Sequence, residues 1–398
     1  MQFLIRAALS AVILGVASIA ASAGISKAPA QKSTYNIRID TVAAGLEHPW
    51  GLAFLPNGEL LVTERPGRLR ILGREGKLSA PLQGVPAVYT SEEGGLLDIA
   101  LGPDFAVSGL VYFSYAEPRG GGRSGTTVAR GMLAPAGQPR LEDVRVIFRQ
   151  EPPHASKAAF GSRLVFMPDG SLFITLGDRF LARDQAQNPT NHLGKIVRVL
   201  ADGRPHPDNP RREGWLPEIW SIGHRNIQAA ALNPASGRLW TIEHGARGGD
   251  EINVPRSGRN YGWPIITYGR DYSYTRIGVG TKKEGLEQPI YYWDPSIAPS
   301  GAVFYTGELF AAWKGDLLVG ALAAQSLRRL VLDGETVVAE EILLKEFGER
   351  IRDVRQGPDG ALWLLTDDPK GEVLRMMPAV EAGCSTDRVF FVPPSQSC

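Results

Sequence analysis

The sequence predicts an all-β fold, a six-bladed β-propeller whose blades each contain four antiparallel strands. A turn followed by an alternating apolar strand recurs six times along the 398 residues. Turns of this kind, with Asn-Gly or Asp-Gly, typically adjoin short strands, and their repetition indicates a repeated architecture. No long amphipathic helical pattern is present, which argues against alternating helices and strands.

The six copies of this repeat set the number of blades. They are residues 55–64, 102–116, 167–178, 233–244, 311–322 and 357–368. Successive turns lie 44 to 79 residues apart, which leaves room for four short strands and variable loops in each unit. A pair of β-sandwiches is the competing fold, but the shared pattern would then be a coincidence.

The N-terminal residues predict export. Arg6 precedes an apolar run over residues 7–20, and Ala21-Ser22-Ala23 supplies the small residues of a cleavage site. The run is short and no stop-transfer pattern follows, so residues 1–23 are predicted to be a signal peptide; an uncleaved anchor helix is the alternative. We expect a periplasmic or secreted protein with no membrane span in the mature chain.

The remaining chain divides into a linker over residues 24–41, the propeller over residues 42–378, and a C-terminal tail over residues 379–398. Both cysteines, Cys384 and Cys398, lie in the tail. A disulfide between them would contribute at most about 3 kcal/mol, and two free thiols are the alternative.

The overall charge excludes some partners. Without Arg6 the number of Lys and Arg residues falls from 43 to 42, which equals the 42 Asp and Glu residues. This balance gives no reason to expect nucleic acid or an anionic membrane surface as a partner. We expect a monomer or a homodimer.

Two arginine-bearing segments are candidates for binding an anion, because loops on a rigid scaffold often carry function. Arg225 offers a planar fork of donors, and Asn226 can donate and accept beside it. Arg350 and Arg352 are two residues apart, so on a strand they share one face. A surface turn is the alternative for the first pair.

For Arg350 and Arg352 the alternative is a structural salt bridge with Glu349 or Asp353.

The glycine-rich segment 242–263 is too poor in apolar residues to be fixed by burial alone. Glu243, Asp250 and Glu251 supply carboxylates, and the turn between them supplies backbone carbonyl groups. Calcium prefers six to eight such oxygens, so the segment is a candidate calcium site. Solvated acidic turns are the alternative, since most charged residues face water.

Taken together, these segments resemble the soluble pyrroloquinoline quinone (PQQ)-dependent sugar dehydrogenases, which include aldose sugar dehydrogenases. The shared motifs follow one another over residues 42–378 and include FGSRLVFMPDGSLFITLGDR, EIWSIGHRNIQ, EHGARGGDEIN, NYGWP and RIRDVRQGPDG. The resemblance implies a six-bladed propeller that oxidises an aldose at C1 to its lactone. It also implies PQQ and Ca²⁺ as cofactors and a separate, unknown electron acceptor.

The same resemblance implies roles for individual residues. Those expected to contact PQQ are Glu93, Arg225, Asn226, Arg350 and Arg352. The carbonyl groups of Gly245 and Ala246 are expected to bind the calcium ion beside PQQ. Glu251 and Tyr261 match positions that bind a second, structural calcium ion.

Two positions depart from the family pattern. The family's general base is a histidine directly before the Phe-Gly motif, where this chain has Ala159, and a PQQ-binding lysine is replaced by Ala323. A positioned general base typically contributes about 100- to 10,000-fold in rate. Asp178 and His154 are the candidates to replace it, although a strand-end aspartate is often a turn cap and a loop histidine often faces solvent.

The departures keep other functions open. A non-catalytic, calcium-binding propeller that binds a sugar, a cell-wall fragment or a protein is the main alternative. A calcium-dependent lactonase-type hydrolase is a third function, supported only by fold analogy.

Overall fold

The computed structural model describes residues 28–134 and 139–379. The predicted signal peptide, Cys384 and Cys398 lie outside the described residues. The described part consists of 23 strands in six antiparallel sheets. Its helical elements are short, namely α1 (Phe105–Ser108) and the 3-10 segments Arg183–Gln187, Ala311–Trp313 and Lys345–Phe347.

The sheets follow one another along the chain as blades. The first contains β2 (Pro49–Phe54), β3 (Leu60–Glu64) and β4 (Arg68–Leu72). The second contains β5 (Leu96–Leu101), β6 (Leu110–Pro118), β7 (Ser124–Leu133) and β8 (Leu141–Arg149). The third contains β9 (Gly161–Phe166), β10 (Leu172–Leu176), β11 (Lys195–Val199) and β12 (Ile219–Ile222).

The other three blades have the same plan. The fourth contains β13 (Ile227–Leu232), β14 (Leu239–Glu243), β15 (Asp250–Asn253) and β16 (Tyr291–Trp293). The fifth contains β17 (Pro299–Phe304), β18 (Leu317–Ala321), β19 (Ser326–Asp333) and β20 (Thr336–Leu343). The sixth contains β21 (Ile351–Gln356), β22 (Leu362–Thr366), β23 (Gly371–Pro378) and β1 (Ile37–Leu46).

The predicted six-bladed propeller is confirmed. In every blade the predicted repeat supplies the second strand, which is β3, β6, β10, β14, β18 or β22. The first blade has three strands, and its fourth position is reduced to a single bridge between Leu72 and Leu78. Pro81 follows soon after, and a proline has no backbone N–H to extend a ladder.

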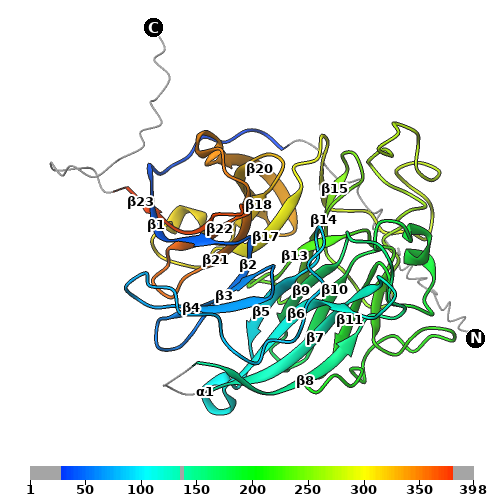
Figure 1. Cartoon of the computed structure of the whole chain (residues 1–398). Coiled ribbons are helices and arrows are strands. Elements are labelled where there is room, and N and C mark those ends of the chain that lie inside the picture. Colours follow the sequence, from blue (N-terminus) through cyan, green and yellow to red (C-terminus); the bar gives the residue numbers. More distant parts are fainter. Residues whose placement is uncertain (1–27, 135–138, 380–398) are drawn as a thin grey trace, which may run out of the picture.

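The ring is closed by pairing the two ends of the described chain. β1 runs antiparallel to β23, with Ile37 opposite Pro378. The propeller therefore begins at Ile37, inside the range that the sequence predicted as a linker. Figure 1 shows the sheets around a common centre, with β2, β5, β9, β13, β17 and β21 innermost.

The core lies between the blades. A separate cluster of buried apolar side chains occupies each of the six interfaces between successive blades. At one interface the ring of Trp240 on β14 meets the ring of Phe304 on β17 edge to face, 5.3 Å between centroids. Because each blade is covered on both faces, second strands such as Leu60–Glu64 are buried throughout.

A buried ionic network ties the innermost strands together at the centre. Arg163 on β9 lies 3.1 Å from Asp98 on β5 and 3.1 Å from Asp353 on β21. Arg355 contacts the same two carboxylates, at 3.0 Å and 2.9 Å. Removing one partner of such a buried pair typically costs about 3–5 kcal/mol. The network therefore fixes the strands whose ends carry the candidate site.

Innermost strands begin, and second strands end, at the same mouth of the ring, because the two are antiparallel neighbours. Residues before β13 and β21 and residues after β10, β14 and β22 are thus brought together there. Among the residues described, no helix is long and apolar enough to cross a membrane.

Candidate functional site

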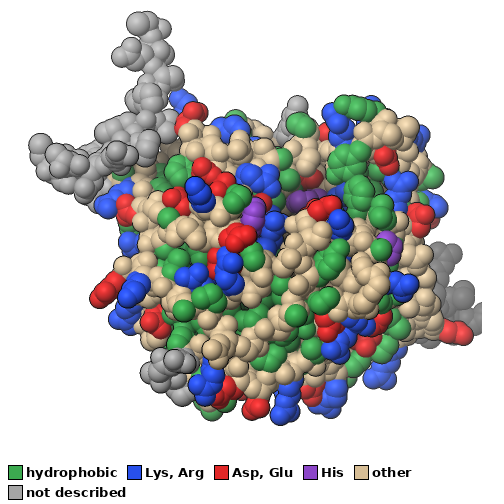
Figure 2. Space-filling model, in the orientation of Figure 1, with side chains coloured by type: hydrophobic (Ala, Val, Ile, Leu, Met, Phe, Trp, Pro, Cys, Tyr) green, Lys and Arg blue, Asp and Glu red, His purple; other side chains and the backbone are tan. Residues whose placement is uncertain are grey.

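The mouth of the ring carries a pocket of about 420 Å³. It lies between the segments that precede β5, β9 and β13 and those that follow β10, β14 and β15. Its polar lining includes Glu93, Lys157, Arg225, Asn226, His244 and Tyr272. Figure 2 shows basic and histidine side chains meeting near the centre of this face, with hydrophobic side chains beside them. Small-molecule sites typically measure about 300–1,000 Å³.

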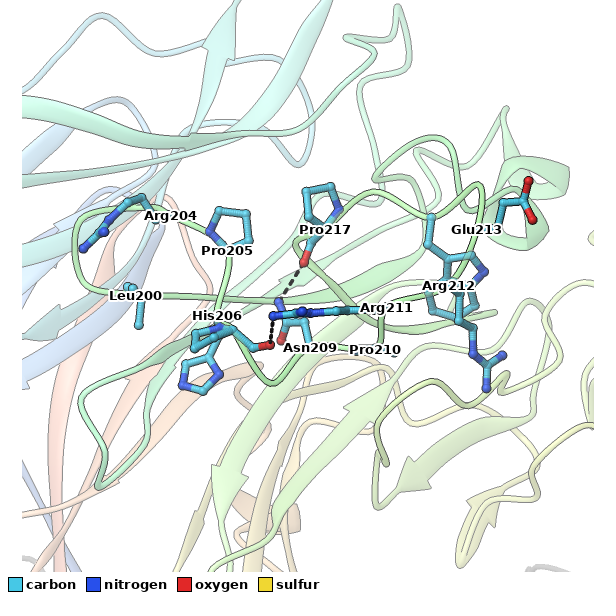
Figure 3. A pocket seen from close by; sticks show the side chains of 12 residues that line it. Leu200, Arg204, Pro205, His206, Asn209, Pro210, Arg211, Arg212, Glu213 and Pro217 are labelled. Atoms are coloured by element: carbon cyan, nitrogen blue, oxygen red, sulfur yellow. Dashed lines mark hydrogen bonds between the residues drawn. The ribbon is translucent and has the colours of Figure 1, made fainter.

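A second hollow, of about 830 Å³, lies on the loop between β11 and β12. Its lining comes from one continuous segment, residues 200–217, and Figure 3 shows Asn209 of this loop donating a hydrogen bond to the carbonyl oxygen of Pro217. Its three arginines are exposed. Binding pockets usually gather polar groups from several elements, so the smaller pocket is the candidate site.

Two of the predicted arginines share one buried carboxylate. The Nη2 atoms of Arg350 and Arg352 lie 2.9 Å and 2.8 Å from Oδ2 of Asp367, which directly follows β22. Burial alone would raise the pKa of Asp367, but Arg352 and Arg350, with a contribution from Arg65, hold this pKa well below its usual range. Three guanidinium groups therefore surround a single carboxylate. The partner is Asp367, not the Glu349 or Asp353 considered from the sequence.

This cluster retains unused donors. The Nε atoms of Arg65 and Arg352 are buried and have no hydrogen-bond partner among the described residues. Arg225 forms no ion pair within that part of the chain; its Nη1 donates to the carbonyl oxygen of His244 at 3.2 Å, and its Nη2 lies 3.4 Å from Oη of Tyr272. Buried charges are normally paired, so this excess of positive charge fits an anionic ligand.

His244 is the residue that sequence reasoning passed over. Burial is the largest cause that lowers its pKa to about 3, and Arg225, Arg352 and Arg350 all add to the effect. The structure thus brings the three predicted arginines together around one imidazole. Its Nε2 lies 2.7 Å from the carbonyl oxygen of Pro299, so Nε2 carries the proton and Nδ1 is the acceptor.

The position of His244 was readable in the sequence, since it ends the fourth repeat and directly follows its strand. The chemical environment of His244 was not readable, because most of its partners, which are Pro299, Arg350 and Arg352, come from the fifth and sixth blades.

Ala159 and Glu93 line the same pocket. The backbone N–H of Ala159 donates a hydrogen bond of 2.8 Å to Oε2 of Glu93. The φ angle of Ala159 is 55°, in the left-handed region that His, Asn and Asp occupy more readily than most other residues with side chains. The backbone therefore has the conformation that a histidine at this position could adopt.

Neither predicted substitute base lines the pocket. Oδ1 of Asp178 accepts the N–H of Phe180 and Oδ2 accepts Nε1 of Trp263, both at 2.7 Å, while burial raises the pKa of Asp178. Nδ1 of His154 accepts the backbone N–H of Ser156 at 3.1 Å, and burial lowers the pKa of His154. The acceptor atoms of both side chains are thus engaged in local structure.

Asp250 holds the glycine-rich segment in place. Its buried carboxylate lies within 3.0 Å of four donors, which are the N–H groups of Gly245, Ile297 and Ala298 and the hydroxyl of Ser296. These bonds join the turn after β14 to the segment before β17. Gly245 and Ala246, whose carbonyl groups are the predicted calcium ligands, are thereby fixed directly after His244.

Glu251, a predicted ligand of the second calcium ion, lies next to another carboxylate. Nδ2 of Asn253 is 3.0 Å from Oε1 of Glu243 and 3.4 Å from Oε2 of Glu251. Burial and the charge of Glu243 raise the pKa of Glu251 well above its ordinary value. A bound cation would offset this accumulation of negative charge.

Tyr261 belongs to the same neighbourhood, because its ring stacks on His224 at 4.9 Å and Nδ1 of His224 lies 3.0 Å from Glu243. No group of three or more His, Cys, Asp or Glu side chains in the described ranges is arranged to hold a metal ion. Calcium in this region would therefore depend on backbone carbonyl ligands. Ala323, at the position of the family's lysine, is exposed just after β18.

Fold and site together define a six-bladed propeller with a cationic small-molecule pocket at one mouth of its ring. The chain belongs to the glucose/sorbosone dehydrogenase family, whose sequence model matches residues 46–375. It is 44% identical over 347 residues to the aldose sugar dehydrogenase YliI of Escherichia coli, a match that covers 86% of this chain and 93% of that protein.

Solved structures agree with this assignment. The apo-form of the soluble aldose sugar dehydrogenase from Escherichia coli superposes with a TM-score of 0.83 at 44% identity, covering 86% of this chain and 100% of that one. The PQQ-bound form of the aldose sugar dehydrogenase from Streptomyces coelicolor gives a TM-score of 0.72 at 30% identity, covering 88% and 99%. The sequence-based assignment to the PQQ-dependent sugar dehydrogenases is thus confirmed.

Proposed function

We propose that this protein is a periplasmic, PQQ- and calcium-dependent dehydrogenase that oxidises an aldose sugar at C1 to its lactone. The observation that carries the proposal is the convergence of Arg225, Arg350 and Arg352 on His244, which lines the pocket, while a single carboxylate, Asp367, balances the last two arginines. PQQ is a flat quinone with several carboxylate groups, so its charge and hydrogen-bonding oxygens match these donors.

The residues predicted to contact PQQ would also orient it in the pocket. Arg350 and Arg352 would hold its carboxylates, while Arg225 and Asn226 would bind the ring oxygens from the side of β13. Asn226 is buried, and its Oδ1 accepts the N–H of Gly161 at 3.0 Å, so its orientation is fixed. When bound, PQQ would supply the two-electron acceptor, and a calcium ion on the Gly245 and Ala246 carbonyl groups would polarise the quinone.

The proton of the sugar C1 hydroxyl needs an acceptor in the pocket. Ala159 has none, and the pocket lining contains one imidazole, that of His244. The bond from Nε2 to Pro299 leaves Nδ1 as the acceptor atom, while burial and the three arginines keep the imidazole neutral in the absence of a ligand. The carboxylates of bound PQQ would offset the charges of the arginines and so raise the pKa of His244 toward neutral pH, where a general base is most effective. His244 is the proposed proton acceptor, in place of the predicted Asp178 and His154.

Reconstitution tests this function. Purified protein without residues 1–23 would be loaded with PQQ and calcium and then mixed with an aldose and an artificial electron-accepting dye. We expect dye reduction that requires both cofactors and the sugar, with a lactone as product. PQQ bound without any sugar-dependent dye reduction, across a panel of aldoses, would refute the enzymatic function.

One observation favours a second candidate function. The expected histidine and lysine positions of the family hold Ala159 and Ala323, which carry no functional groups. A non-catalytic propeller that binds calcium and a sugar, a cell-wall fragment or a protein is consistent with this loss. Calcium-dependent thermal stability in the absence of PQQ binding would support it.

A further inference from the structure

One tryptophan ring contacts two buried arginines at the centre of the propeller. Trp50, the second residue of β2, is 3% exposed. Cζ of Arg163 lies 4.1 Å from the centroid of its ring, and Cζ of Arg352 lies 5.9 Å from it. A guanidinium group within about 6 Å of an indole is attracted to the ring face, and tryptophan is the strongest aromatic partner of this kind. Trp50 therefore joins an arginine of the buried ionic network to an arginine predicted to bind PQQ.

Arg163 is fully committed to structure. Its Nη1 and Nη2 atoms pair with Asp98 and Asp353, each at 3.1 Å, and its Nε donates to the carbonyl oxygen of Gln228 at 2.7 Å. These contacts fix the side chain of Arg163, which is 2% exposed, without any contribution from Trp50. Arg163 is thus a fixed neighbour against which the indole ring is placed.

Arg352 is held from three sides instead. Its Nη2 lies 2.8 Å from Oδ2 of Asp367, its Nη1 lies 3.3 Å from Oε1 of Gln228, and the ring of Trp50 lies against the guanidinium group. Asp367 is shared with Arg350, so it does not balance the whole charge of Arg352. Within the described residues the buried Nε has no hydrogen-bond partner. The three contacts therefore set the orientation of the guanidinium group and leave its Nε–H without a partner.

Trp50 also offsets the repulsion between these two cations. Nη2 of Arg163 lies 3.5 Å from the backbone carbonyl oxygen of Arg352. Burial is the largest cause that lowers the pKa of Arg163, and the charge of Arg352 adds to this effect. An indole ring attracts both guanidinium groups, whereas an aliphatic side chain attracts neither. Replacing the ring would therefore loosen Arg352, which is the less firmly held of the two.

The indole itself is fixed by apolar packing. Trp50 belongs to a buried cluster with Leu97 and Phe160. Phe160 directly follows Ala159, which lines the candidate pocket. Trp50 thus connects the wall of the pocket with the arginine cluster, and its place is set by packing as well as by the arginines.

We propose, resting on the proposed function, that Trp50 is a positioning residue for the cofactor. It acts through Arg352, whose guanidinium group it holds against the ring face. The Nε–H of Arg352 then stays available to a carboxylate of PQQ, and the side chain does not have to be ordered when the cofactor binds.

PQQ titration in the presence of calcium, followed by absorbance, tests the positioning role. Trp50→Leu is expected to weaken PQQ binding about three- to thirtyfold, and Trp50→Phe, which keeps an aromatic face, by less than about threefold. Trp363→Leu is the matched control, since Cζ of Arg375 lies 6.0 Å from the ring of Trp363 and neither residue lines the pocket. Wild-type affinity in Trp50→Leu would overturn the proposal. An equal loss in Trp50→Leu and Trp50→Phe would also overturn it, because packing alone would then explain the effect.

Unfolding of the apoprotein by urea tests the contact itself and needs no cofactor. Trp50→Leu, Arg352→Gln and the double variant are compared with the wild type in a double-mutant cycle. We expect Trp50→Leu to shift the unfolding midpoint less when Arg352 is already replaced. Additive shifts would refute the contact, whereas absence of PQQ binding by the wild type would refute the proposed function, so the two failures are distinguished. Trp50→Met, which fills more of the space, takes the place of Trp50→Leu if that variant does not fold.

Discussion

Nε2 of His244 lies 2.7 Å from the carbonyl oxygen of Pro299, which fixes the imidazole with Nδ1 as its acceptor atom. His244→Gln keeps a donor for Pro299 but removes the basic nitrogen. We expect sugar-dependent dye reduction to fall about 100- to 10,000-fold while PQQ affinity changes little. His206→Gln, on the loop between β11 and β12, serves as a control. Retention of wild-type turnover in His244→Gln would exclude this residue as the proton acceptor.

The same histidine gives a pH dependence of stability. Its pKa falls from 6.5 to about 3 on folding, because of burial and the charges of Arg225, Arg352 and Arg350. Between these values the unfolded chain binds a proton that the folded protein does not. The stability that the neutral His244 side chain contributes to the folded protein is therefore fully present above pH 6.5 and is lost as the pH falls toward 3. The loss is at most about 1.4 kcal/mol per pH unit.

Chemical unfolding of the apoprotein at several pH values measures this effect. We expect the free energy of unfolding to decline less between pH 6.5 and pH 4 in His244→Gln than in wild type. Parallel declines would mean that the imidazole is not held neutral.

Ala159→His should restore a base at the position where the family carries one. The backbone there already has a φ of 55°, which histidine tolerates, and the position lines the pocket. We expect kcat to rise about 10- to 100-fold, a part of what a well-placed base contributes. Ala155→His is the matched control on the same lining and should give no gain. A rate that is unchanged in both variants would show that residue 159 does not approach the sugar.

The arginine cluster should determine cofactor affinity. Arg352→Gln removes one charged donor and is expected to weaken PQQ binding about 10- to 100-fold, in line with about 1.5–3 kcal/mol for a charged hydrogen bond. Arg350→Gln, at a more exposed side chain, tests the same point with less risk to folding. Arg375→Gln on β23 is the control. Arg375 pairs with Asp359 and does not line the pocket, so this variant should bind PQQ normally. Equal affinity in all three variants would contradict the assigned role.

The repeat was readable from the sequence because each blade places the same turn before the same buried strand. Arg225, Arg350 and Arg352 were readable as candidates because loops on a rigid scaffold often carry function and a guanidinium suits an anionic ligand. The carboxylate shared by Arg350 and Arg352, and the imidazole that all three arginines affect, were not readable, since those contacts join different strands and, for His244, different blades. For Asp178, the sequence alone could not show that both carboxylate oxygens accept hydrogen bonds, because one partner, Trp263, is 85 positions away in the chain.

The central claim is that the three arginines and the turn after β14 seat PQQ. Titration of PQQ into the purified protein, with and without calcium and followed by absorbance, tests it most directly. The account predicts a saturable spectral change with one PQQ bound per chain at low micromolar concentration, tighter when calcium is present. An absorbance spectrum that remains that of free PQQ at every ratio, with calcium present, would contradict it.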